Sequence, residues 1–491
     1  MNPEPSTTSA PVNRWLALLV LCAGALMIVL DVTIVNVALP TIQDDLGFSS
    51  ADLAWVVNAY LIAFGGLLML AGRLGDLISR RGVFLAGLWV FTAASLACGL
   101  ADSQAALVAA RFVQGAGGAM TSAVILGMIV TMFPEPREQA KAIGVYAFVA
   151  AGGGSLGLVF GGTLTQALDW HWIFFVNVPI GLATALLAVR LIDRDTGIGL
   201  RQGADLPGAV LITSALMLAV YTIVKPAAEQ GWTAGTTLAC GAGAVALLLG
   251  FLWREARAGS PLIPLRIFRS RTIAGANLVQ GLSAAGMFGM FFLGSLYMRR
   301  VLGYDALQIG LSFLPMTLAM AVLSLRFADR LAIRLGARLT SIVGLTLVGA
   351  GLLLFTQVPV HADYATDLLP VMLLIGIGGG ICFPAQMNLA MSTATPSDAG
   401  LASGLVNTTA QVGGALSLAV LATLSASRTS SLAREGASSA AALTGGYHLA
   451  FAIAAALVAA AVTVAIVVVP RAKAAGSGSP DEEGGVALEA A

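Results

Sequence analysis

The sequence predicts an all-helical membrane protein in which fourteen transmembrane helices form two bundles of six, with two further helices inserted between them in chain order. The composition, the long apolar stretches and the placement of basic residues support this fold class. The chain has 491 residues, of which 58% are hydrophobic and only 10% charged, whereas a soluble domain carries about 25% charged residues. The net charge of +1 argues against a nucleic-acid partner, so the expected surroundings are the lipid bilayer.

Each predicted helix is a stretch long enough to cross the hydrocarbon core, which takes about 20 apolar residues. The first stretch begins after Arg14 and is too long for the core of a signal peptide, so we expect it to be retained. In chain order the fourteen stretches lie at roughly 15–38, 52–71, 82–101, 105–132, 140–164, 173–190, 206–224, 234–253, 273–298, 307–325, 338–357, 369–391, 401–424 and 446–469.

These stretches group into units with polar tails at both ends. The segment 254–271 contains two prolines and five arginines, which predicts a cytoplasmic connector lying against the membrane surface. The Gly/Ser/Glu-rich C-terminus predicts disorder. The expected units are a cytoplasmic tail at 1–14, a six-helix bundle at 15–199, two inserted helices at 200–260, a second six-helix bundle at 261–472 and a disordered cytoplasmic tail at 473–491.

The basic residues decide the orientation, because they favour cytoplasmic segments. An even number of spans puts both termini on one side. Placing them in the cytoplasm puts twenty of the 26 Lys and Arg residues inside and five outside. Arg111 is left within a span, and Arg299-Arg300 lies on the disfavoured outer side. We therefore expect a multi-pass protein of the inner (plasma) membrane with both termini cytoplasmic.

Two turns with similar sequences indicate an internal repeat. Gly72–Gly82 follows the second span and Ala328–Arg338 follows the tenth, and each places an acid before clustered arginines. If the seventh and eighth spans are an insertion, these turns occupy equivalent places in the two bundles. Basic inner loops explain the arginines, but they explain the matched acid less well. A parallel six-helix repeat around a central gap is typical of transporters.

Asp31 is the most informative residue, because it lies within an apolar run where an ionised carboxylate costs roughly 2.5–3.5 kcal/mol on insertion scales. It lies about seven residues from the outer end of its span, and Arg111 about six from the outer end of the fourth, so both are about 10 Å deep. Similar depth predicts a direct or water-bridged interaction. The pair suits proton coupling; the alternative is a structural ion pair that orients the two helices. A relay role and direct substrate contact remain open for Arg111.

Five motifs occur in order at matching spans, namely Leu30–Pro40, Gly72–Arg81, Arg111–Gly115, Trp170–Gly181 and Pro261–Leu265. On these motifs the chain closely resembles the major facilitator superfamily, and in particular the fourteen-span drug:proton antiporters of the EmrB/QacA type. The resemblance covers about residues 15–470. It implies the major facilitator fold with two extra central helices.

The fifth-span motif of that family, G-P-x-x-G-G, has a departure in this chain. Here it reads Gly157-Leu158-Val159-Phe160-Gly161-Gly162, so Leu158 replaces the proline and the kink is lost. Gly153, Gly157 and Gly161 still recur every four residues. They predict one face of small residues that lets helices approach closely.

The resemblance implies a gating loop at the cytoplasmic end of the second span. Its residues here are Gly72, Asp76, Arg80 and Arg81, with Leu77 and Ser79 departing from the family pattern. The implied role is a latch that holds the inner gate closed through ion pairs to neighbouring helices. The alternative is a solvated basic turn. Exposed ion pairs are worth only about 0–1 kcal/mol, so a latch requires partial burial.

Polar, aromatic and methionine side chains within the spans are candidates for a substrate cavity. Methionine and phenylalanine adapt to varied apolar shapes, which suits a site with broad specificity. Interhelical hydrogen bonds and lipid contacts are the competing explanation. The candidates are Trp55, Asn58, Asn277, Gln280, Met287, Phe288, Phe291, Gln386, Asn388, Asn407 and Gln411.

Other functional classes lack their signatures. None of the three lysines follows a glycine, which excludes a Walker A loop and ATP drive. The three histidines are scattered, so we expect no enzyme, no metal and no cofactor. The predicted function is a monomeric secondary transporter that exports amphipathic drugs or antibiotics across the cytoplasmic membrane in exchange for protons. The alternative is an exporter of a lipid or other endogenous metabolite.

Overall fold

The computed structural model describes residues 14–199, 203–391 and 399–470, and every regular element within these ranges is helical. Residues 1–13 of the predicted N-terminal tail and the whole predicted C-terminal tail, 473–491, lie outside the described residues. The helices that make up every regular element of the described ranges confirm the predicted all-helical membrane fold.

The first half of the chain holds the first bundle and the inserted helices. Its elements are α1 (Arg14–Leu46), α2 (Ala54–Leu77), α3 (Arg80–Gly99), α4 (Gln104–Met132), α5 (Pro136–Ala167), α6 (Trp172–Phe175), α7 (Asn177–Leu191), α8 (Leu206–Val224), α9 (Pro226–Gln230) and α10 (Gly235–Arg257).

The second half begins with a short 3₁₀ turn in the connector. Its elements are η2 (Leu265–Arg269), α11 (Arg271–Arg300), α12 (Ala306–Arg326), α13 (Ala328–Leu335), α14 (Ala337–Phe355), η3 (Tyr364–Leu368), α15 (Leu369–Met391), α16 (Ala399–Arg434) and α17 (Ser439–Val467).

Thirteen helices among the described residues are long and apolar enough to cross a membrane, one fewer than predicted. The difference concerns the fifth expected span. It is present as α5, a glycine-rich helix of 32 residues that is not among the thirteen. At about 1.5 Å per residue α5 is still long enough to cross the bilayer.

Local signals fix where several helices start. Ser79 caps α3 by accepting a hydrogen bond from the Gly82 backbone, and Ser438 caps α17 in the same way. Asp305 and Gln308 form a reciprocal capping box at the start of α12. These side chains satisfy backbone N–H groups that have no partner within the helix.

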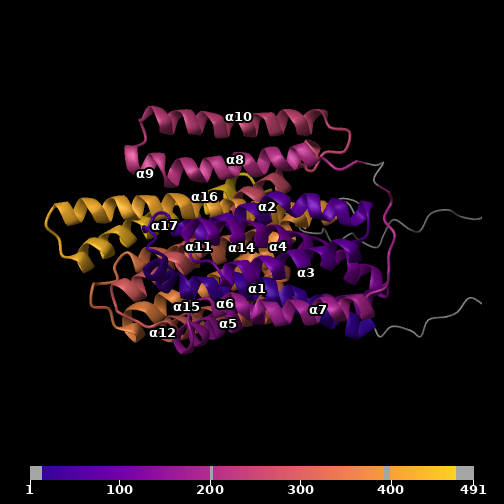
Figure 1. Cartoon of the computed structure of the whole chain (residues 1–491), viewed down its shortest axis with the longest axis horizontal. Helices are drawn as coiled ribbons and strands as arrows, with labels where there is room; N and C mark the ends of the chain where they lie inside the picture. Colours follow the sequence, from indigo (N-terminus) through magenta and orange to yellow (C-terminus); the bar gives the residue numbers. More distant parts are fainter. Residues whose placement is uncertain (1–13, 200–202, 392–398, 471–491) are drawn as a thin grey trace, which may run out of the picture.

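The inserted helices lie outside the two bundles. Figure 1 shows α8 and α10 as a pair along one side of the molecule, with α10 outermost. The helix α8 packs against α2 of the first bundle and α16 of the second. The bundles themselves meet where α5 packs on α12, α2 on α16 and α1 on α11. The helix α8 thus covers the α2–α16 seam.

We call the end of the molecule where α1 starts the basic end and the other the opposite end. Arg14 pairs there with Glu138 at the start of α5 over 3.5 Å, and α2 turns into α3 at the same end. Arg338, at the start of α14, donates to the carbonyl of Ala465 near the end of α17 over 2.9 Å. Because the spans alternate in direction, α1 starts at the basic end and α17 finishes at the same end.

The two turns of the predicted repeat differ in structure. The stretch Gly72–Leu77 is the last part of α2, so the turn itself is only Ile78-Ser79. Its predicted counterpart contains a short helix, α13, instead of a tight turn. Apolar residues at 328, 331, 332 and 335 have helical spacing, which explains this amphipathic helix. The side chain of the matched acid, Asp329, lies outside the described residues.

Candidate functional site

Asp31 lies near the middle of α1 and accepts three hydrogen bonds from other helices. Arg111 Nη1 donates over 2.6 Å and Gln114 Nε2 over 2.7 Å, both from α4, while Asn177 Nδ2 donates over 3.0 Å from α7. Asp31 is fully buried and Arg111 is only 1% exposed. One cation and two amides therefore hold a carboxylate inside an apolar span.

Arg111 is equally well partnered. Its Nε donates to the carbonyl of Val56 over 3.0 Å, and Nη1 also donates to Gln114 Oε1 over 2.7 Å. The guanidinium lies 4.5 Å from the ring centroid of Tyr60 and 5.7 Å from that of Phe174. Taking one partner from a buried ion pair costs about 3–5 kcal/mol, because a buried charge is left alone. The two charges therefore act as a unit.

The sequence analysis missed the two amides. Gln114 lies three residues after Arg111, which puts both on one face of α4. Gln114 and Asn177 each also donate to Ser95 Oγ over 3.1 Å. Polar side chains in apolar spans were the available signal. Nothing in a single sequence indicates that four helices bring them to one point.

Asp31 is deeper in its helix than predicted. The first span was predicted to end at about residue 38, but α1 continues through Pro40 to Leu46. Asp31 is thus about 22 Å from that end, whereas Arg111 is about 10 Å from the start of α4. The two still meet because α1 extends beyond α4 at the opposite end.

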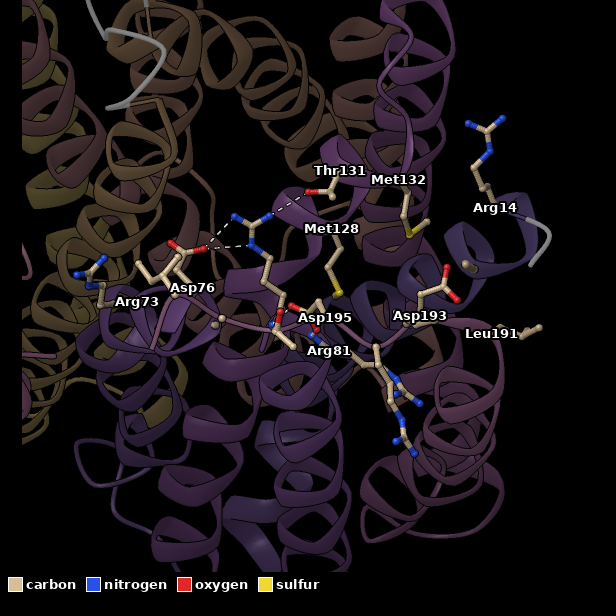
Figure 2. A pocket seen from close by; sticks show the side chains of 18 residues that line it. Arg14, Arg73, Asp76, Arg81, Met128, Thr131, Met132, Leu191, Asp193 and Asp195 are labelled. Carbon is tan, nitrogen blue, oxygen red and sulfur yellow. Dashed lines mark hydrogen bonds and ion pairs between the residues drawn. The ribbon is translucent and has the colours of Figure 1, made fainter. Parts of the chain in front are cut away.

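The predicted gating residues tie α2 to its own bundle. Arg80 Nη2 pairs with Asp76 over 2.9 Å, and Nη1 donates to Thr131 Oγ1 of α4 over 3.0 Å (Figure 2). Arg81 Nη2 donates to the carbonyl of Val189 in α7 over 2.6 Å. Asp76 and Arg80 are 46% and 37% exposed, so their ion pair is screened by solvent and worth little by itself.

Asp195, after α7, also binds the turn between α2 and α3, and the sequence analysis did not single it out. It accepts hydrogen bonds from Ser79 Oγ over 2.6 Å and from the backbone of Arg80 and Arg81 over 2.7 and 3.1 Å. Burial raises the pKa of the Asp195 carboxyl, but these hydrogen bonds outweigh it and the pKa lies below its usual value. Its contribution to stability is therefore present above the usual carboxyl pKa and is lost as the pH falls through the lowered one.

Arg300 joins the two bundles at the opposite end. From the end of α11 it donates to Gln43 Oε1 over 3.1 Å and forms an ion pair with Asp44, both on α1. Nearby, Lys225 at the end of α8 pairs with Asp52 over 3.1 Å. Two of the five basic residues predicted for the outer side, Arg300 and Lys225, thus form ion pairs with residues of the first bundle.

A family model described as Major Facilitator Superfamily matches residues 21–418. The chain belongs to the Major Facilitator Superfamily. The puromycin resistance protein pur8 of Streptomyces alboniger is 39% identical over 470 residues, covering 92% of this chain and 93% of the relative. The cephamycin export protein CmcT of Amycolatopsis lactamdurans is 40% identical over 436 residues, covering 88% and 89%.

Solved structures agree on the fold. A bacterial homologue of the human lysosomal transporter Spinster superposes with a TM-score of 0.68 at 15% identity, covering 94% of this chain and 98% of that one. A peptide transporter of the POT family gives 0.65 at 17% identity, covering 91% and 96%. The predicted superfamily is confirmed, and with it an integral membrane transporter whose relatives are transporters, which are not enzymes. The prediction of a drug exporter of this superfamily is confirmed as well.

In this superfamily member a cavity of about 650 Å³ lies between the bundles toward the basic end. Side chains of α2, α4 and α16 line it together with the connector at 259–264. Of the predicted cavity residues, Asn407 is part of this lining. Gln411, one turn further along α16, packs its Cβ side against Gly65 of α2 at the bundle interface.

The remaining cavity candidates have different surroundings. Asn58 and Gln386 are fully buried; among the described residues both amide atoms of Asn58 and the Nε2 of Gln386 have no hydrogen-bond partner. Asn277 accepts a hydrogen bond from Thr409 over 3.0 Å, so it bonds α11 to α16. Asn388 is exposed on α15. The other candidates pack at least partly into the apolar core or are buried within α11; they are Trp55, Gln280, Met287, Phe288 and Phe291.

The predicted glycine face packs against α1. A Cβ on Gly153 would meet Leu26, one on Gly157 the Thr33 side chain, and one on Gly161 the backbone of Ile34. Gly162 faces the other bundle instead, and its Cβ would lie 2.7 Å from the carbonyl oxygen of Ala306. Small residues thus allow α5 to touch both α1 and α12.

Reversing the charge of Arg300 is expected to loosen the opposite end. In a variant without the four native cysteines and with Ala306→Cys as a reporter, Arg300→Glu should raise labelling by a membrane-impermeant thiol reagent about two- to fivefold, since an exposed ion pair is worth up to about 1 kcal/mol. Adding Asp44→Arg should restore protection. Arg299→Glu is the control, because Arg299 donates to Tyr304 beside it. Equal labelling of both glutamate variants would contradict a role for the ion pair.

Proposed function

We propose that this chain exports amphipathic antibiotics or similar drugs across the plasma membrane in exchange for protons, as a monomer with both termini in the cytoplasm. The buried Asp31–Arg111 pair is the observation that carries the coupling step. The names of relatives that share about two fifths of its residues support the cargo class. The basic end then faces the cytoplasm, in keeping with the excess of Lys and Arg there.

Protonation of Asp31 is the proposed coupling event. All three of its partners donate hydrogen bonds, so they favour a side chain at position 31 whose oxygens both accept. A proton on the carboxyl removes the attraction to Arg111 and leaves a buried cation without a counter-charge. Since Arg111 belongs to α4 and Asp31 to α1, the change loosens one helix from the other. The same α1 carries Gln43 and Asp44 at the opposite end.

The arrangement of contacts supports loading from the cytoplasm in this conformation. The cavity lined by Asn407 lies toward the basic end, while Arg300 joins the bundles at the opposite end. Cargo that enters from the cytoplasm or the inner leaflet would reach the space between the bundles first. Opening of the opposite end then requires the Arg300 contacts with α1 to break. Proton entry from outside and cargo release alternate in this scheme.

Flux into proteoliposomes tests the proposal. Purified protein is reconstituted, a pH gradient with an acidic interior is imposed, and the uptake of a panel of amphipathic antibiotics is followed. We expect accumulation above equilibrium that stops when an ionophore collapses the gradient. Accumulation that ignores the gradient would contradict proton exchange. Absence of flux for every antibiotic, with transport of an added lipid instead, would contradict the cargo class.

A further inference from the structure

The segment Asp195–Gly199 closes the end of α2. Its backbone N–H groups donate to the final carbonyls of the helix, which have no partner within α2. Three hydrogen bonds do this, from Gly197 to Ile78 (2.8 Å), from Ile198 to Asp76 (3.0 Å) and from Gly199 to Leu77 (3.0 Å). A stretch more than a hundred residues away thus takes the place of a local helix cap.

The same segment also closes the start of α3. The carboxylate of Asp195 accepts hydrogen bonds from the first two backbone N–H groups of α3 and from the capping residue Ser79. A negative charge is favourable at this position, where the helix dipole is positive. The segment therefore satisfies both helix ends that flank the two-residue turn. Figure 2 shows Asp195 beside Arg81 in a second pocket at the basic end, which both residues and Asp193 line.

Gly197 makes this contact one of backbone against backbone. A Cβ at position 197 would fall on the carbonyl group of Leu77 and the nitrogen of Ile78, closer than real Cβ atoms approach other atoms. Its φ is not in the left-handed region, so the requirement for glycine comes from space alone. Any side chain there must push the segment away from the turn.

We infer that residues 195–199 form a strap that holds the gating turn in place and connects it to the inserted helices. Arg80, the first residue of α3, ties α2 to α4. The strap bonds the backbone of both Arg80 and Asp76, so displacing it moves both members of their ion pair. The chain continues from Gly199 to α8, which covers the α2–α16 seam. The importance of the turn for transport rests on the proposed function, whereas the docking of the strap does not.

Hydrogen exchange tests the docking directly. Purified full-length protein in detergent is compared with Asp195→Asn and Gly197→Ala, following the amides of residues 78–84 by mass spectrometry. Loss of a hydrogen bond to a charged group should raise their exchange about tenfold in Asp195→Asn. The larger displacement by Gly197→Ala should raise it at least as much. Unchanged exchange in both variants would overturn the strap, whatever they do to transport.

Two neighbouring substitutions serve as controls. Asp193→Asn removes an acid that lines the same pocket and makes no hydrogen bond or ion pair with the turn among the described residues. Gly259→Ala adds a Cβ where no atom of the described residues lies within 4 Å. Neither should alter exchange at 78–84. Export by the strap variants should slow with cargo binding unchanged. Raised exchange with normal export would keep the docking but overturn the link to the gate. If the unmodified protein exported nothing, that result would count against the proposed function and not against the docking of the strap.

Discussion

Asp31→Asn is expected to abolish uphill export, leaving antibiotic accumulation in proteoliposomes at the level of empty vesicles. An amide cannot release a proton at any pH reached in the cell, so the imposed gradient has nothing to act on. The side chain keeps its size and still accepts a hydrogen bond from Arg111. A second measurement uses a pH-sensitive dye. Cargo should release protons from the unmodified protein in weak buffer, and not from the variant.

The control for Asp31→Asn separates coupling from folding. The single variant leaves Arg111 buried without a counter-charge, which destabilises by about 3–5 kcal/mol. The double variant Asp31→Asn with Arg111→Gln removes both charges and should recover most of the melting temperature without recovering export. Asp31→Glu keeps an acid and should retain part of the activity. Full-rate uphill export by Asp31→Asn would refute the proposed mechanism while leaving the fold untouched.

Gly310→Ala is expected to slow export about tenfold or more by wedging the two bundles apart, because overpacking a tight contact costs about 1–3 kcal/mol. Gly310 of α12 faces the carbonyl of Leu158 in α5, and its Cβ would overlap that oxygen. A change of rotamer cannot separate these atoms, since the Leu158 oxygen belongs to the backbone and the added Cβ is bonded directly to the backbone. The opposite end should become accessible to the impermeant thiol reagent at the same time.

The matched control for Gly310→Ala lies on the partner helix. Among the described residues no atom lies within 4 Å of the Cβ position of Gly152 in α5, so Gly152→Ala should leave export unchanged. Alanine there also favours the helix by roughly 0.5–1 kcal/mol. Equal slowing by both variants would contradict a specific role for the contact between Gly310 and α5. Normal export by Gly310→Ala would show that the α5–α12 contact is not needed for the cycle.

The sequence was a good guide to what the bilayer imposes. Long apolar stretches, a buried acid and the excess of basic residues in alternate loops are direct consequences of transferring charge and backbone out of water. The pairing of Asp31 with Arg111 followed from similar estimated depth. Asp31 lies farther from the end of its helix than predicted, because α1 continues past residue 38 and through Pro40 to Leu46.

The sequence was a poor guide wherever two distant segments meet. The strap consists mainly of backbone groups and an exposed aspartate, which carry no pattern of spacing. Arg300 stood out only as an exception to the orientation rule, and its partner Asp44 gave no signal at all. Among the cavity candidates, Asn277 bonds to a neighbouring helix and Asn388 is exposed. Which of these happens depends on how each helix is rotated about its axis, and the sequence of a weakly amphipathic span does not specify that rotation.

The sequence by itself determined the environment, the number of spans to within one and the superfamily, and it pointed to Asp31 as the acid to test for coupling. These follow from hydrophobicity, charge and local motifs, which act over one helix at a time. Only the tertiary structure decided which polar groups surround Asp31, which glycine faces which bundle, and what fastens the turn between α2 and α3. Those contacts join residues far apart in the chain, and their geometry depends on how every helix between them packs.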